Sequence, residues 1–234
     1  MVIVPHPDDE LGAGGTLYEF AARGLSTGLI TLTRGEKGRT LGLCAPEDLG
    51  EMRRQELARA AADLRVGYFE HADFPDSGSA AIGPDPYPGI PRGTGKPGDG
   101  LPNHPEAVDF LRERLAAFQP RIVITFPPDG SNGHADHVAT SRFVREAWAE
   151  ASPASVLYFY AYDGPLPAGV ERKFPVTHRI ELSREAAIAK LRAQGRHQTQ
   201  ALSGTRFLQQ FPERTFFETF HLPGYPGPVL GELL

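Results

Sequence analysis

Short apolar stretches that favour β-strands alternate with stretches of helical spacing through most of the chain. The expected strands cover residues 2–4, 27–33, 66–69, 121–126, 156–161, 176–182 and 215–222, and the expected helices cover 10–23, 46–64, 104–118, 137–150 and 183–195. This alternation predicts an α/β fold, a three-layer Rossmann-like domain with a mostly parallel sheet and helices on both faces. Ligands of such sheets bind beyond the carboxyl ends of the strands, so polar residues that directly follow a strand are candidates for function.

The composition restricts the classes of protein to consider. A chain of 234 residues with 40% hydrophobic and 23% charged residues fits one globular domain, residues 1–234. The net charge of −5, without a dense stripe of lysine and arginine, argues against a nucleic-acid partner. No apolar run is long enough for a membrane span, and the first residues lack a signal-peptide pattern. The single cysteine, Cys44, suits a reducing cytoplasm, where we expect this protein.

Residues 75–105 differ from the rest of the chain, because 15 of these 31 residues are glycine or proline. Long stretches without regular structure are usually functional or disordered, so this insert is expected to be a lid, a contact in a homo-oligomer, or disordered. Residues 93–98 within it match the letters G-x-G-x-x-G. No strand precedes them and Pro97 interrupts them, so they do not indicate a dinucleotide site.

The first polar cluster, Pro5-His6-Pro7-Asp8-Asp9-Glu10, directly follows the first expected strand. Carboxylates suit a helix N-terminus, so the acidic residues alone have a structural explanation. That explanation does not account for a histidine between two prolines, which stiffen the turn and remove two backbone donors. The cluster therefore indicates a metal-binding or catalytic role.

The second cluster, Asp129 to His137, follows the expected strand 121–126 and opens a helix. His134 and His137 share one helical face, and Asp136 is placed to orient an imidazole. A polar helix cap with two surface histidines is the structural alternative. In a parallel sheet both clusters lie at the same edge, where their histidines and carboxylates suit a three-ligand catalytic metal site with a position left for water.

With these two motifs, P-H-P-D-D-E and H-A-D-H, the sequence resembles the zinc-dependent N-acetylglucosaminyl de-N-acetylases of the LmbE/PIG-L family, which includes deacetylases of bacterial thiol biosynthesis. Weaker similarities are the turn at 33–38 (T-R-G-E-K-G), the helix segment 53–56 (R-R-Q-E) and the stretch 197–200 (H-Q-T-Q). The resemblance covers nearly the whole chain.

The resemblance implies a role for each matching residue. His6, Asp9 and His137 would bind zinc, and Asp8 would be the general base. His134 would stabilise the oxyanion or act as general acid, with Asp136 tuning it. Two further residues, Arg53 and His197, would lie near the bound substrate.

These residues suit amide hydrolysis. Bound zinc lowers the pKa of its water to about 7, and a neighbouring carboxylate removes the proton. Two histidines and one carboxylate also suit Fe²⁺, so iron is an alternative to Zn²⁺. The leaving amine takes its proton from either Asp8 or His134.

The expected function is removal of an N-acetyl group from an N-acetylglucosamine-type amino-sugar conjugate, a small-molecule partner. Three alternatives remain open: an amidase of the same family that acts on a thiol S-conjugate, a non-catalytic metal-dependent sugar-binding protein, and a dinucleotide-dependent oxidoreductase. The aglycone and the oligomeric state are not fixed by the sequence.

Overall fold

The computed structural model describes residues 1–78, 93–94, 99–162 and 173–233. Its seven strands form one sheet in the order β3-β2-β1-β4-β5-β7-β6. The strands are β1 Val2–Val4, β2 Gly28–Thr33, β3 Tyr68–Phe74, β4 Ile122–Thr125, β5 Val156–Tyr160, β6 His178–Glu181 and β7 Phe217–His221. Strands β1 to β5 pair in parallel, whereas β7 runs antiparallel to both β5 and β6.

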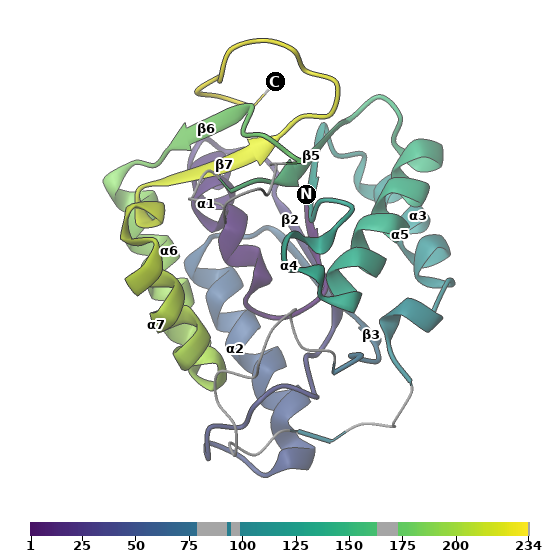
Figure 1. The fold of residues 1–234 in the computed structure, drawn as a ribbon, viewed down its shortest axis with the longest axis vertical. Coiled ribbons are helices and arrows are strands. Elements are labelled where there is room, and N and C mark those ends of the chain that lie inside the picture. Colours follow the sequence, from purple (N-terminus) through teal and green to yellow (C-terminus); the bar gives the residue numbers. More distant parts are fainter. Residues whose placement is uncertain (79–92, 95–98, 163–172, 234) are drawn as a thin grey trace.

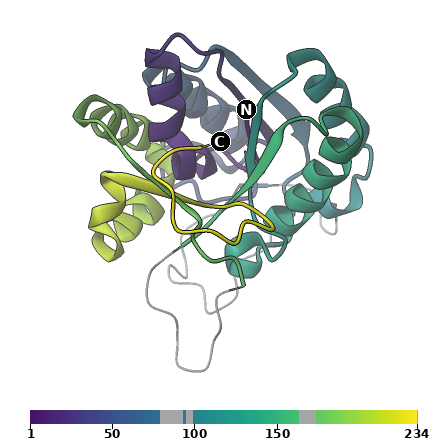
Figure 2. The same cartoon turned by 90° about the horizontal axis from the view of Figure 1, so that it is seen from above.

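Helices cover both faces of the sheet (Figure 1). The helices are α1 Gly14–Ala22, α2 Leu49–Asp63, α3 Ala107–Phe118, α4 Gly130–Gly133, α5 Ala135–Ala151, α6 Arg184–Arg196 and α7 Ala201–Gln210. Short 3₁₀ turns are η1 Asp9–Ala13, η2 Pro46–Asp48, η3 Leu101–Asn103, η4 Gln198–Gln200 and η5 Pro212–Thr215. The view from above in Figure 2 shows α1, α6 and α7 on one side of the sheet and α3 and α5 on the other.

Alternation along the buried strands explains the three layers. In β1, Val2 and Val4 pack against α1 and α2, whereas Ile3 between them packs against α3 and α5. All three residues are buried, because β1 lies at the centre of the sheet. Such an apolar strand is typical of a parallel sheet that is covered on both faces. The structure confirms the predicted fold class, a mostly parallel α/β sheet between helical layers.

Most predicted elements match the observed ones within a few residues, with three differences. Strand β3 is longer than predicted and ends at Phe74. The helix predicted over 10–23 begins as the 3₁₀ turn η1 and becomes α1 at Gly14. Helix α7 was not predicted at all. Ser183 caps the start of α6, since its side chain accepts a hydrogen bond from the backbone N–H of Ala186 at 3.1 Å.

Two glycines after β1 allow close packing. A Cβ atom on Gly15 would lie 2.3 Å from the side chain of Leu182, and one on Gly12 would lie 2.9 Å from the ring of Tyr160. The predicted lid falls largely on residues 79–92 and 95–98, outside the described residues.

The strand order changes direction between β1 and β4. The chain moves from β1 to β2 and β3 on one side, and β4 and β5 lie on the other side of β1. Such a switch point opens a crevice at the carboxyl ends of the two central strands. Both polar clusters of the sequence follow these two strands, so the topology brings them to one place.

Candidate active site

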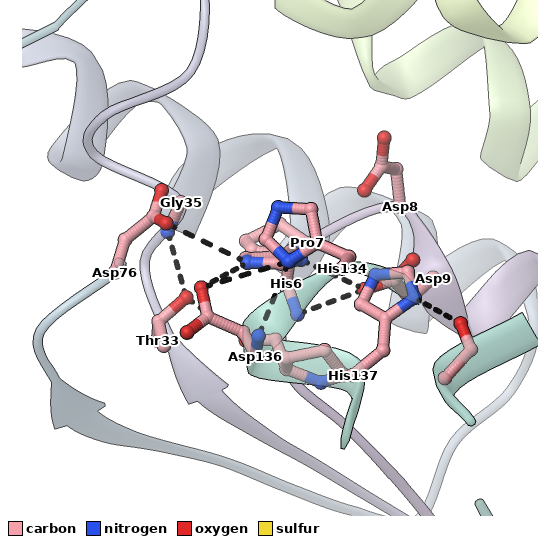
Figure 3. A network of polar contacts seen from close by, with 12 residues as sticks. His6, Pro7, Asp8, Asp9, Thr33, Gly35, Asp76, His134, Asp136 and His137 are labelled. Atoms are coloured by element: carbon pink, nitrogen blue, oxygen red, sulfur yellow. Dashed lines mark hydrogen bonds and ion pairs between the residues drawn. The ribbon is translucent and has the colours of Figure 1, made fainter. Parts of the chain in front are cut away.

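The turn after β1 presents the first cluster. Asp8 has a backbone φ of 110°, a left-handed conformation that costs a non-glycine residue roughly 1–3 kcal/mol. This turn ends the strand and begins η1, so that Asp8 and Asp9 face different surroundings. In Figure 3 the Asp8 carboxylate points away from the contact between His6 and Asp136.

The segment after β4 presents the second cluster. His134 is the N-cap of α5, where its Nδ1 accepts a hydrogen bond from the backbone N–H of Asp136 at 3.2 Å. One helical turn later, His137 points back to the loop and contacts the carbonyl oxygen of Gly130 through Nδ1 at 3.1 Å. The ring of Phe126, just beyond β4, stacks on the His137 ring with the centroids 3.9 Å apart. The carbonyl oxygen of Gly130 and the ring of Phe126 fix the orientation of the His137 ring. The cap at His134 fixes the start of the helix that carries it.

His6, Asp9 and His137 each offer a ligand atom, and these three atoms lie within 4.8 Å of one another. Asp9 Oδ2 lies 3.1 Å from His6 Nδ1 and 3.6 Å from His137 Nε2. His6 and Asp9 lie about 130 residues before His137 in the sequence. Figure 3 shows that the three side chains converge.

The hydrogen-bond partners of His6 and His137 indicate which ring nitrogen carries the proton, and these tautomers suit a bound cation. A carbonyl oxygen only accepts hydrogen bonds, so His137 donates from Nδ1 to Gly130 and keeps a lone pair on Nε2. In the same way, Asp136 Oδ2, 3.0 Å from His6 Nε2, takes the proton of that nitrogen and leaves a lone pair on His6 Nδ1 when the ring is neutral. Lone pairs on two imidazoles and one carboxylate then face each other, an arrangement that a metal ion stabilises.

The carboxylates around His6 also favour a positive charge at this place. Burial alone lowers the pKa of His6, but contacts with Asp136, Asp76 and Asp9 outweigh burial and raise it well above the usual value. In a protein without metal, a proton on His6 therefore balances the surrounding carboxylates. A bound divalent cation would supply the same positive charge.

The structure places the carboxylate of Asp136 on His6 instead of on His134. Asp136 is fully buried, and its Oδ2 lies 3.0 Å from His6 Nε2 but 4.0 Å from His134 Nδ1. The backbone N–H of Ser77 also donates to this oxygen at 3.0 Å. Asp136 thus orients a candidate metal ligand while it stays within 4.0 Å of His134, the residue that it was expected to tune.

The surroundings of His134 favour the neutral form of its ring in this structure. Burial, together with the neighbouring His6 and His137, lowers the pKa of His134 to about 4, so its ring is neutral near pH 7. Since its Nδ1 accepts from the backbone, the neutral ring carries its proton on Nε2. This N–H is the donor that His134 can offer to a substrate oxygen.

Asp8 is held by Arg53, which is 4% exposed. The guanidinium donates to Asp8 Oδ1 at 3.1 Å, to the carbonyl oxygen of Gly35 at 3.0 Å, and to that of Pro7. Burial raises the pKa of Asp8 to about 6, although the charge of Arg53 opposes this shift. Arg53 lies behind Asp8, not among the described residues that line the nearby cavity, and it braces the turn after β1.

His197 lies beside the cluster and is 2% exposed. Its Nε2 is 2.6 Å from Glu10 Oε1, and Glu10 itself is completely buried. Burial alone lowers the pKa of His197, but the Glu10 carboxylate outweighs burial and raises it. A second buried contact holds the turn η4, which follows His197. There Glu56 of α2 accepts hydrogen bonds from the backbone N–H and the hydroxyl of Thr199.

A cavity of about 320 Å³ opens next to these residues. Asp8, Asp9 and His197 lie in its wall, together with residues from β5, α6, α7 and β7. The volume is within the range of small-molecule sites in enzymes. The candidate chemical groups therefore border a space that can hold a ligand.

Residues 1–148 match the sequence profile of the PIG-L family, described as GlcNAc-PI de-N-acetylase. This match covers more than half of the chain. The chain belongs to the PIG-L family. The two motifs that carried the resemblance, residues 5–10 and 134–137, both lie within the matched part.

Several curated proteins are similar in sequence. A 1D-myo-inositol 2-acetamido-2-deoxy-alpha-D-glucopyranoside deacetylase of Saccharopolyspora erythraea is 33% identical over 69% of this chain and 56% of its own length. The deacetylase of that name from Saccharomonospora viridis is 30% identical over 85% and 84%. A mycothiol S-conjugate amidase of Streptomyces coelicolor is 30% identical over 65% and 52%. The chain thus spans about half the length of most of these curated relatives.

Solved structures agree on the PIG-L fold. The conserved protein TT1542 from Thermus thermophilus superposes with a TM-score of 0.59 at 29% identity, over 99% of this chain and 95% of that chain. The N,N'-diacetylchitobiose deacetylase from Pyrococcus horikoshii superposes with a TM-score of 0.65 at 19% identity, over 94% and 82%. The second likeness supports the fold alone.

The sequence reasoning missed Asp76, the pairing of Glu10 with His197, and the contact that Tyr160 makes with the turn after β1. Asp76 is 4% exposed and lies 3.7 Å from His6 Nε2. It follows β3, so its place after a strand was a usable signal, but that strand was expected to end at residue 69. The hydroxyl of Tyr160 donates to the carbonyl oxygen of Asp9 at 3.2 Å, a contact that no local pattern indicates.

Proposed function

We propose that this protein is a metal-dependent hydrolase that removes an N-acetyl group from a small N-acetylglucosamine-type amino-sugar conjugate. The observation that carries this proposal is the meeting of two motifs: ligand atoms of His6, Asp9 and His137 lie within 4.8 Å, and Asp8 borders the adjoining cavity. Membership of the PIG-L family and relatives named as acetamido-glucopyranoside deacetylases support the same reaction.

His6, Asp9 and His137 would hold the metal, and zinc is the ion we propose. Two imidazoles and one carboxylate form a three-ligand set of the kind found in catalytic zinc sites, and Fe²⁺ is the alternative for the same donors. When bound, the ion would act as a Lewis acid and make water acidic enough to supply hydroxide near neutral pH.

The described residues show no helix with the length and apolar character that a membrane crossing needs.

Asp8 would take a proton from the attacking water. Its side chain is adjacent to Asp9 in the chain but points in another direction, so one carboxylate can hold the metal while the other handles protons. Arg53 binds one carboxylate oxygen and leaves the other for this task. A positioned general base of this kind contributes roughly 10²- to 10⁴-fold to the rate.

His134 would donate a hydrogen bond from Nε2 to the oxygen that becomes negative as the amide carbonyl is attacked. A neutral donor that is already oriented by its cap stabilises such an oxygen without reorganisation. Asp136 would keep the His6 ring in the orientation that metal binding needs. The leaving amine would receive its proton from Asp8 or His134.

Hydrolysis of a thiol S-conjugate is the second candidate function. It is favoured by the similarity to a mycothiol S-conjugate amidase, which covers 65% of this chain. Both reactions break an amide next to the same groups, so the site geometry serves either one. The difference lies in which substrate the cavity accepts.

The test is a panel of N-acetylated amino sugars, their glycosides and a thiol S-conjugate, assayed for free amine. The protein is purified without added metal, analysed for metal content, and assayed before and after chelation and with Zn²⁺ or Fe²⁺ restored. The proposal expects amine release from the acetamido sugars that chelation abolishes and one of the two ions restores. Release that a chelator leaves unchanged contradicts the proposal, and preferred cleavage of the S-conjugate favours the second candidate.

A further inference from the structure

The cavity beside Asp8 is larger than an acetyl group requires, and much of its wall is apolar. Its volume is about 320 Å³. Eight large apolar or aromatic side chains contribute to the wall, and six of them are Leu11, Tyr160, Leu191, Phe207, Leu208 and Phe217. These six come from η1, β5, α6, α7 and β7, so the apolar wall is built by most of the second half of the chain.

Helix α7 is the unusual part of this wall. Its apolar residues Phe207 and Leu208 face the cavity, next to Ser203 and Gly204 of the preceding turn. None of the ten residues of α7, all of which the structure describes, is buried. Helices in proteins are stabilised mainly by packing of their apolar face, and here that face meets the cavity instead of the core.

The cationic side chains in the wall are engaged within the protein. Lys190 pairs with Glu218 at 2.9 Å, and Glu218 also accepts hydrogen bonds from the first turn of α1. Arg214 donates to the hydroxyl of Thr219 and to the carbonyl oxygen of Ala161. Glu218 thus compensates the charge of Lys190, whereas the oxygens that Arg214 contacts are neutral. Three carboxylates, Asp8, Asp9 and Glu218, lie in the same wall as these two cations, so the wall does not favour an anionic ligand.

We propose that this cavity is a subsite for a hydrocarbon group that the substrate carries on its N-acylated amino sugar. The proposal rests on the proposed function, because Asp8 and Asp9 border the same cavity and fix where the amide would be. The apolar face of α7 would close over the hydrocarbon group and gain the packing partner that the protein itself does not provide. The group is either the aglycone of a glycoside or an acyl chain longer than acetyl, since both place hydrocarbon beside the amide.

Two substrate series distinguish these sources. The first compares the methyl and hexyl glycosides of N-acetylglucosamine, and the second compares N-acetylglucosamine with N-hexanoylglucosamine. A fully buried methylene favours binding by about fourfold, so an incompletely enclosed hexyl group should raise kcat/KM by about tenfold in one of the two series. A gain in the first series identifies the aglycone, and a gain in the second identifies the acyl chain.

Variants of α7 test the wall. Phe207→Ala should reduce the hexyl-to-methyl ratio of kcat/KM by about fivefold, since the variant loses one wall of the subsite. Leu202→Ala is the matched control, because Leu202 lies on the same helix, is 37% exposed and is not part of the cavity wall. This control should keep the wild-type ratio.

A binding measurement tests the proposed subsite independently of the proposed function. The same ligands are titrated calorimetrically into the metal-loaded Asp8→Asn variant, which needs no turnover. Tighter binding of a hexyl ligand, lost in the added Phe207→Ala change, supports the subsite even if no amide is cleaved. Equal binding of the short and long ligands in both series overturns the subsite, and amine release from the methyl glycoside would then leave the proposed function intact.

Discussion

The carboxyl ends of β1 and β4 and the wall formed by α6, α7 and β7 are built in different ways. The first region is compact and polar: Asp136 is fully buried, His6 is 8% exposed, and each charged group has a close partner. The second region surrounds a cavity, and helix α7 has no buried residue. The first region thus fixes the orientation of a few reactive atoms, whereas the second leaves room for a ligand.

The match to the PIG-L family includes the first of these two regions and not the second. It covers residues 1–148, which include both motifs, and it ends before β5, α6 and α7. We therefore propose that the first region carries the chemistry and that the second selects the substrate. Function resides in such sites and not in the fold as a whole.

Replacement of a metal ligand should have the largest effect. His137→Ala removes one of three converging ligand atoms, so the purified protein should lose its metal and its activity should fall to the level of the chelated enzyme. Metal analysis and the amine-release assay measure both. His104→Ala is the matched control, since His104 lies outside the cluster and pairs with Asp99 and Glu106. Full metal content and activity in His137→Ala would remove this residue from the site.

Replacement of Asp8 should separate catalysis from metal binding within the same region. Asp8→Asn keeps the size of the side chain but removes the base, so kcat should fall by roughly 10²- to 10⁴-fold. The metal content should stay at the wild-type level, because Asp9 and not Asp8 belongs to the ligand set. Retention of most of the activity in the metal-loaded variant would show that another group accepts the proton.

The ion pair between Glu10 and His197 joins the two regions and should matter for stability. Glu10 lies in η1 and is fully buried, so Glu10→Gln leaves a buried histidine without its charged partner. Breaking a buried pair in this way lowers the free energy of unfolding by about 3–5 kcal/mol. Urea unfolding of the metal-free protein measures the change.

An exposed pair on α2 provides the control for this stability measurement. Arg54 and Glu51 are both nearly half exposed, at 44% and 48% of their side chains. Arg54→Ala should lower the free energy of unfolding far less than Glu10→Gln does, because water screens such pairs. Equal losses for Glu10→Gln and Arg54→Ala would mean that the buried pair does not link the two regions energetically.

The pH dependence of stability should show the same link with a smaller effect. The pKa of His197 is raised in the folded protein by Glu10, so the folded state binds this proton more tightly than the unfolded chain does. The resulting stability is fully present below about pH 6.5, the unfolded value, and is lost as the pH rises through the raised pKa. Unfolding of metal-free wild type and His197→Gln between pH 6 and pH 9 measures this slope. A wild-type slope equal to that of the variant would contradict the assignment.

The strand–helix alternation and the two motifs were enough to predict the sheet, its mostly parallel character and the meeting of residues 5–10 with residues 134–137. Parallel strands put their carboxyl ends on one edge whatever their order, so this prediction did not need the strand order. The antiparallel pairing of β7 was not predictable, because the spacing of apolar residues does not encode the direction of a neighbouring strand.

The partners of individual side chains were less predictable than the elements. Asp136 was expected to tune His134, its near neighbour in sequence, and it also binds His6, 130 residues away, a contact that no local pattern indicates. Helix α7 was missed because Ser203, Gly204 and Thr205 in its first half have low helix propensity. Arg53 was expected near the substrate, and only the tertiary structure shows that it braces the turn at Pro7 and Asp8.

Anomalous diffraction from crystals grown with Zn²⁺, recorded on both sides of the zinc absorption edge, tests the central claim most directly. The expected result is a strong peak within bonding distance of His6 Nδ1, Asp9 and His137 Nε2, which is absent from crystals of His137→Ala. A zinc peak held by other residues, or His6 and His137 rings turned away from a common point in the zinc-grown crystals, would contradict it.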